Sequence, residues 1–267
     1  MPDQIADLAR EVLQTFRLWR LPVDPIAIIR KEGIELEKAD YGENFDARIE
    51  YYPQLDQFCI FQQQVGGLRT EGRVRFSLAH ELGHYYLPEH AKRLRDGKNH
   101  NSVGDYRSRD PLELQADEFA AALLMPFELF RRELDTFRCG FCDLKDIGRL
   151  AERLGTSLTS TARRYCQCDR EPCTVFFSEA GAVRWGVAST DMQLRQMYYY
   201  KNGDAPPDGS KTTKLWHQLD RGEQGEWVSG TVDAHVWFDH PRAEYLWEEA
   251  MPLGNTGIVI TQLTPED

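Results

Sequence analysis

The chain has 267 residues, which is enough for one large domain or two small ones with a sizeable buried core. Its formal net charge of −11 opposes non-specific binding to nucleic acid phosphates, and its 41% hydrophobic residues are ordinary for a soluble globular protein. There is no apolar run of about 18 residues, and the N-terminal residues lack the apolar core of a signal peptide. We therefore expect a cytoplasmic protein, in which thiols stay reduced.

The N-terminal part predicts two helices and a small sheet. Apolar residues at helical spacing indicate an amphipathic helix over residues 2–18. A second helix is predicted from Pro25 to Gly33, with Asp24 as its N-cap. Three segments rich in Tyr, Ile and Phe have the character of strands, at residues 34–38, 47–53 and 58–63.

The middle of the chain predicts two longer helices separated by a loop. The first covers residues 72–87, with an apolar stripe that includes Leu78 and Leu82, and ends at Pro88. Residues 89–110 are polar and predict a long surface loop. The next helix opens at Asp110, has Pro111 in its first position and ends near residue 126.

The C-terminal part predicts two short helices followed by strands. Residues 144–154 and 157–165 have helical patterns separated by Gly155, which is the outline of a helix-turn-helix. A loop rich in Gly, Pro and Asp is predicted over residues 201–211. Strand-like segments lie at residues 175–177, 183–187, 227–238 and 257–262.

The strongest motif is HExxH, which runs from His80 to His84 inside the first long helix. Residues four apart lie on one helix face, so both imidazoles can bind one metal ion. Glu81 lies beside them, where its carboxylate can hold a metal-bound water. Neutral imidazole suits Zn²⁺, and a third protein ligand would complete a catalytic site. Gly83 leaves room for another element to approach closely.

The third ligand has two candidates. His90 lies six residues after His84, which is the metzincin spacing, but Leu87 stands where that class requires glycine. Glu113 would complete a His₂Glu set, and Asp117, one turn later, could accept a hydrogen bond from a ligating imidazole. Asp110 and Glu113 are also spaced as a capping box, in which Glu113 only stabilises the start of its helix.

The stretch RFSLAHELGHYYL followed by ELQADEFAAALLMP resembles the ImmA/IrrE family of metallopeptidases. The resemblance extends from LPVDPIAIIRKEGIELE to LKDIGRLAERLGTSLTSTARRY, about residues 20–185. It implies that His80, His84 and Glu113 bind the metal and that Glu81 is the catalytic carboxylate. It also implies proteolysis of a helix-turn-helix transcriptional repressor, which would relieve repression of stress-response or mobile-element genes.

From these patterns we expect an α+β protein with three parts. Residues 1–135 would form a zincin-like zinc metallopeptidase domain with a small sheet and an active-site helix. Residues 136–170 would form a short helical accessory segment. Residues 171–267 would form an α/β or mainly β domain, for which the resemblance implies a sensor-like role, although the segment is short for a GAF fold.

Several alternatives stay open. The chain could sequester a repressor without cleaving it, or act on small peptides, and Mn²⁺ or Fe²⁺ could occupy the same ligands as Zn²⁺. Cys139 and Cys142 form a CxxC pair with three further cysteines downstream, so a second, structural zinc site is conceivable. The helix-turn-helix outline could bind DNA, but its arginines form only a modest basic cluster, so we expect a packing role. These arginines are Arg149, Arg153, Arg163 and Arg164.

Overall fold

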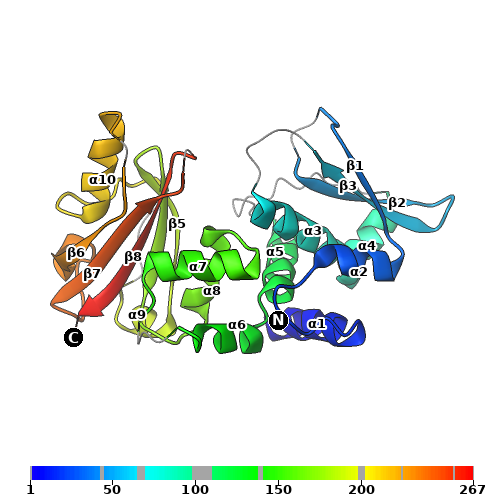
Figure 1. The fold of residues 1–267 in the computed structure, drawn as a ribbon, viewed down its shortest axis with the longest axis horizontal. Coiled ribbons are helices and arrows are strands. Elements are labelled where there is room, and N and C mark those ends of the chain that lie inside the picture. Colours follow the sequence, from blue (N-terminus) through cyan, green and yellow to red (C-terminus); the bar gives the residue numbers. More distant parts are fainter. Residues whose placement is uncertain are drawn as a thin grey trace. The chain divides into compact units, whose positions relative to one another are not determined.

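The computed structural model describes residues 2–42, 45–64, 70–97, 110–137, 141–197, 202–223, 225–254 and 256–266. The protein has the predicted α+β fold (Figure 1). It divides into two compact units, of which unit 1 comprises Met1–Thr136 with Leu150–Ser157, and unit 2 comprises Phe137–Arg149 with Leu158–Asp267. None of the helices in the described ranges has the length and apolar character needed to cross a bilayer.

Unit 1 begins with two helices and a three-stranded sheet. The elements are α1 (Pro2–Thr15), α2 (Pro25–Glu32), β1 (Glu35–Ala39), β2 (Ala47–Tyr52) and β3 (Gln57–Gln63). Asp24 caps α2 as predicted, because its side chain accepts a hydrogen bond from the backbone N–H of Ile26. The central strand β3 pairs parallel with β1 and antiparallel with β2, which leaves β2 at an edge of the sheet.

Four helices follow in unit 1: α3 (Glu71–Tyr86), α4 (Pro88–Arg95), α5 (Pro111–Leu124) and α6 (Phe127–Leu134). The predicted helices at 72–87 and from Pro111 onward are α3 and α5. The prediction of a loop from residue 89 is wrong at its start, because Pro88 both follows α3 and begins α4. His90, Ala91 and Leu94 bury one face of α4, and residues 98–109 of the predicted loop lie outside the described ranges.

The helix α3 is the centre of unit 1. It contacts β2 and β3 of the sheet, and it packs against α5, which in turn packs against α1. Its buried residues include Leu78 and Leu82 of the predicted apolar stripe, and also Phe76. The most buried helix of the unit therefore carries the HExxH motif.

Unit 2 contains a five-stranded antiparallel sheet in the order β5-β4-β8-β7-β6. Its helices are α8 (Leu158–Gln167), α9 (Thr190–Leu194), α10 (Lys211–Asp220) and the 3-10 turn η1 (Ala234–Val236), and α7 (Leu144–Leu154) is shared with unit 1. The strands are β4 (Thr174–Glu179), β5 (Ala182–Ala188), β6 (Val228–Asp233), β7 (Tyr245–Pro252) and β8 (Ile258–Glu266). The sequence predicted all of these strands except β7, and it predicted neither α9 nor α10.

Residues 136–170, predicted as a helical accessory segment, form α7 and α8 and are divided between the two units. The role of this segment as a separate domain, like the three-part division as a whole, stays a prediction.

Candidate metal centre

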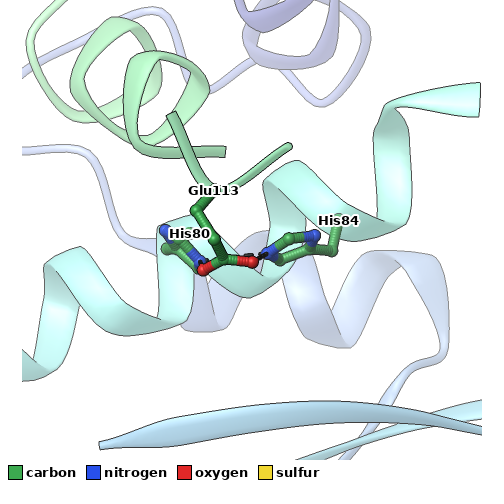
Figure 2. Close-up of side chains that lie close together, drawn as sticks. All are labelled: His80, His84 and Glu113. Carbon is green, nitrogen blue, oxygen red and sulfur yellow. Dashed lines mark hydrogen bonds and ion pairs between the residues drawn. The ribbon is translucent and has the colours of Figure 1, made fainter. Parts of the chain in front are cut away.

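The helix α3 presents His80 and His84 on one face. Thr70 caps the helix by accepting a hydrogen bond from the backbone N–H of Arg73, so the motif begins well inside a regular helix. Both histidines are buried, and their Nε2 atoms lie 3.0 Å apart. Two imidazole nitrogens thus point at the same small volume (Figure 2).

Glu113 comes to this volume from α5. One carboxylate oxygen lies 3.3 Å from Nε2 of His80, and the other lies 3.5 Å from Nε2 of His84. Figure 2 shows the carboxylate between the two rings. Asp110 caps α5 by accepting a hydrogen bond from the N–H of Leu112, so the start of the helix has a cap while Glu113 faces the histidines.

The three side chains fit a tetrahedral metal ion. An ion with ligands at about 2.0–2.1 Å holds neighbouring ligand atoms roughly 3.3 Å apart, which is close to the separations between the nitrogens and oxygens here. Within the described ranges, His80, His84 and Glu113 are the one group of three such residues whose ligand atoms all lie within 4.8 Å of one another. Two imidazoles and a carboxylate are a donor set that zinc accepts in catalytic sites.

A close helix crossing brings Glu113 to the histidines. A Cβ atom added at Gly83 would lie 3.0 Å from Cα and 3.1 Å from the carbonyl oxygen of Ala116. Only glycine therefore lets the backbones of α3 and α5 approach this closely, as the sequence suggested. Glu113 and Asp117 flank Ala116 on α5, so the crossing places both acidic residues beside the motif.

Asp117 forms a hydrogen bond with Nδ1 of His80, the outer ring nitrogen, which faces away from the ligand volume. Its Oδ1 atom lies 2.8 Å from Nδ1 of His80, as expected for a residue that orients a metal ligand. Burial lowers the pKa of His80, but the hydrogen bonds with Asp117 and Glu113 outweigh it and raise this pKa to about 10. The acidic surroundings thus favour a positive charge at this position, which is what a metal cation supplies.

Glu81 lies on the strand side of the motif helix. It is fully buried, and its Oε2 atom accepts a hydrogen bond of 3.0 Å from the backbone N–H of Ile49 on β2. The negative charge of Glu81 also acts on the neighbouring His80, raising its pKa. The edge strand therefore fixes one oxygen of this carboxylate, and the carboxylate acts on the neighbouring His80.

His90, the alternative third ligand, is not part of the ligand group. Its Nδ1 atom lies 2.9 Å from Nδ1 of His84, and its Nε2 atom lies 3.0 Å from Oε1 of Gln115. Both ring nitrogens face other side chains, so His90 contacts the ligand His84 instead of the ligand volume. The motif spacing suggested that His90 was near the site, but its actual position depends on α4, which the sequence analysis did not predict.

The cysteines of unit 2 form no group of three metal ligands within the described residues. Cys142, Cys166, Cys168 and Cys173 are all buried, and Sγ of Cys166 lies 3.3 Å from Sγ of Cys173. Cys139 lies outside the described ranges. Cys59 is buried beside Phe45 and Phe61 in the core of unit 1.

Three arginines of the helix-turn-helix outline contact residues of their own unit. Arg149 forms an ion pair with Asp146 at 2.9 Å, and Arg153 forms one with Glu133 at 2.5 Å. In unit 2, Arg163 lies over the ring of Trp185, and Arg164 is buried. The packing role of this segment stays a prediction.

Comparisons with known proteins support this description. Residues 66–165 match the family model of the IrrE N-terminal-like domain, Peptidase_M78. No curated protein matches the chain in sequence. Among solved structures, a Mycobacterium tuberculosis transcriptional regulator is similar, with a TM-score of 0.62 at 14% identity, over 97% of this chain and 76% of that chain. At that identity the similarity indicates a shared fold alone.

The matched segment includes the whole HExxH motif together with Glu113 and Asp117. The family model and the geometry of the site therefore describe the same part of the chain. Residues 66–165 are therefore an IrrE N-terminal-like domain of the Peptidase_M78 family, which agrees with the resemblance to the ImmA/IrrE metallopeptidases.

Proposed function

We propose that this protein is a zinc-dependent endopeptidase that cleaves a helix-turn-helix transcriptional repressor and so relieves repression of stress-response or mobile-element genes. The convergence of His80, His84 and Glu113 carries the metal-dependent part of this proposal. The family resemblance carries the choice of substrate. The name of the similar fold, a transcriptional regulator, is compatible with a role in transcription.

The residues of the site divide the reaction between them. A zinc ion held by His80, His84 and Glu113 would supply a Lewis acid that polarises the scissile carbonyl and activates water. Glu81 takes the proton of the attacking water and passes it to the leaving amine. The hydrogen bond from the Ile49 N–H orients Glu81 for this transfer. Burial of the histidines and of Glu81 strengthens each of these electrostatic interactions.

The test incubates the purified, zinc-loaded full chain with the helix-turn-helix repressor encoded nearest its gene. Glu81→Gln removes the proton acceptor but keeps the shape of the side chain, and Glu89→Gln, at an exposed position on α4, is the matched control. We expect two discrete fragments whose masses sum to that of the repressor plus one water from the wild type and from Glu89→Gln, and none from Glu81→Gln or after addition of a chelator. Loss of a proton acceptor typically lowers the rate by about 10²–10⁴-fold.

The other outcomes separate the alternatives. A stable complex without a fragment, formed equally by Glu81→Gln, would replace the proposal with sequestration of the repressor. Cleavage of unrelated short peptides with the repressor left intact would indicate a broader peptidase.

A further inference from the structure

The outer nitrogen of His84 leads into a chain of buried contacts that the proposed reaction does not use. Nδ1 of His84 lies 2.9 Å from Nδ1 of His90, and Nε2 of His90 lies 3.0 Å from Oε1 of Gln115. His90 is 2% exposed, and Gln115 is half-buried. These contacts run from α3 through α4 to α5, and both α4 and α5 pack against the motif helix.

A metal ion bound at Nε2 of His84 determines which ring nitrogen of His84 and of His90 carries a proton. A metal ligand uses the lone pair of Nε2, so a neutral His84 carries its proton on Nδ1. That N–H can donate only to a lone pair, so Nδ1 of His90 must be the acceptor. His90 then carries its proton on Nε2 and donates it to the amide oxygen of Gln115. Each group has a matching partner, and both rings are neutral.

The other proton arrangements do not serve a metal. If His90 donated from Nδ1, His84 would accept there and carry its proton on Nε2, where the metal needs a lone pair. A doubly protonated His90 would present an N–H to the N–H of His84. The contacts therefore select one tautomer for each ring.

We infer that His90, held by Gln115, is a positioning residue that fixes the tautomer and ring orientation of His84, as Asp117 does for His80. This inference rests on the proposed metal centre. Hydrogen-bond partners of this kind set the affinity of a site as well as the orientation of its ligands. Glu81, Glu113 and Asp117 already place carboxylates around the site, and a neutral acceptor orients His84 without adding another negative charge.

The location of α4 makes this contact available. Only Leu87 separates α3 from α4, and Pro88 starts the new helix at once. Ala91 and Leu94 anchor α4 in the core of unit 1, which turns His90 back toward the motif helix. The short helix thus places His90 beside Nδ1 of His84, the ring nitrogen that faces away from the ligand volume.

The test measures the zinc dissociation constant of the full chain by competition with a chromophoric chelator, together with the absorption bands of the Co²⁺-substituted protein. His90→Leu removes the acceptor at similar volume, and we expect zinc affinity to fall by about 10–100-fold. His90→Asn keeps an acceptor near the position of Nδ1, so its affinity should stay within a few-fold of wild type. Tyr86→Phe is the matched control, because it removes a hydrogen bond from α3 to Glu32 that is not part of the contacts between His84, His90 and Gln115.

A His90→Leu protein that folds and binds zinc as tightly as the wild type would overturn the inference but leave the metal centre standing. If His90→Leu does not fold, Gln115→Met tests the same chain one step further out. It should lower zinc affinity several-fold, and unchanged affinity would overturn the inference. A wild-type chain that takes up no zinc at His80, His84 and Glu113 would overturn the proposed function, and this inference with it.

Discussion

The environment of His80 and His84 differs at the two outer ring nitrogens. Nδ1 of His80 faces the carboxylate of Asp117 at 2.8 Å, whereas Nδ1 of His84 faces the imidazole of His90 at 2.9 Å. A carboxylate partner makes a metal-bound imidazole more basic, so His80 should be the stronger electron donor of the two.

Asp117→Ala should lower zinc affinity by about 10–100-fold, because the Nδ1 proton of His80 loses its buried acceptor. Asp117→Asn keeps an oxygen acceptor and should lose less. Equilibrium competition with a chelator measures both variants. Two variants with the affinity of the wild type would show that Asp117 does not support the metal ligand.

Among the site residues, the sequence could predict those whose arrangement depends on one helix alone. The spacing of His80, Glu81 and His84 requires only that α3 be helical. Sequence spacing leaves the role of Glu113 open, because it also allows a capping box or a ligand at His90. The tertiary contact between α3 and α5 decides its position, and no local pattern contains that contact.

Among the elements, the crossing of α3 and α5 organises the site. Gly83 on α3 meets the backbone of Ala116 on α5, with Phe119 also close to the glycine. The two ligands of α3 and the one ligand of α5 are held together by this crossing. The distance between the helices should therefore control metal affinity.

Gly83→Ala should weaken zinc binding, because the new Cβ would lie 3.0 Å from Cα of Ala116. This distance is too short for an unstrained contact, so the substitution should push α5 away from α3. Alanine gains about 1 kcal/mol of helix propensity, but overpacking typically costs about 1–3 kcal/mol, so the free energy of unfolding should not rise. Gly148→Ala on α7 is the matched control, because a Cβ there meets nothing within 4 Å.

We expect Gly148→Ala to stabilise the protein slightly and to leave zinc affinity unchanged. Chemical denaturation and chelator competition measure the two effects. A Gly83→Ala protein with higher stability and wild-type zinc affinity would contradict the role of this close approach.

The elements missed from the sequence have physical reasons in common. The helix α4 is short and half of its residues are charged, so its buried face of His90, Ala91 and Leu94 did not stand out from a loop. The strand β7 contains Glu248 and Glu249, which are both buried. These two charged residues interrupt the apolar pattern by which a strand is predicted. Hydropathy patterns cannot register a carboxylate whose burial is compensated by partners elsewhere in the fold.

Those partners belong to the scale of the whole molecule. Consecutive strand residues point to opposite faces of a sheet, so the side chains of Glu248 and Glu249 lie on the two different faces of the sheet in unit 2. Glu248 accepts hydrogen bonds from Thr212 of α10 and from Trp237. Glu249 accepts one from the backbone N–H of Leu144, 105 residues earlier in the chain. Burial raises the pKa of Glu249, although its hydrogen bonds oppose this shift.

The α+β class and the strongly periodic elements, such as α1, α3 and α7, could be predicted because periodicity is a local property. The division into two units could not, since residues 150–157 pack with unit 1 although the residues on both sides of them belong to unit 2. This division depends on contacts between distant segments. One such contact is at Gly72, where an added Cβ would lie 2.6 Å from the backbone of Thr156.

Zinc binding by His80, His84 and Glu113 is the basis of the proposed reaction and of the role inferred for His90. The measurement that tests it most directly is the zinc content of the dialysed full-length protein, determined by mass spectrometry of the metal. We expect one zinc ion per chain in the wild type, in Glu81→Gln and in a Cys142→Ser control, and none in His84→Ala. Zinc that persists in a folded His84→Ala protein, or that disappears with Cys142→Ser, would contradict zinc binding at this site.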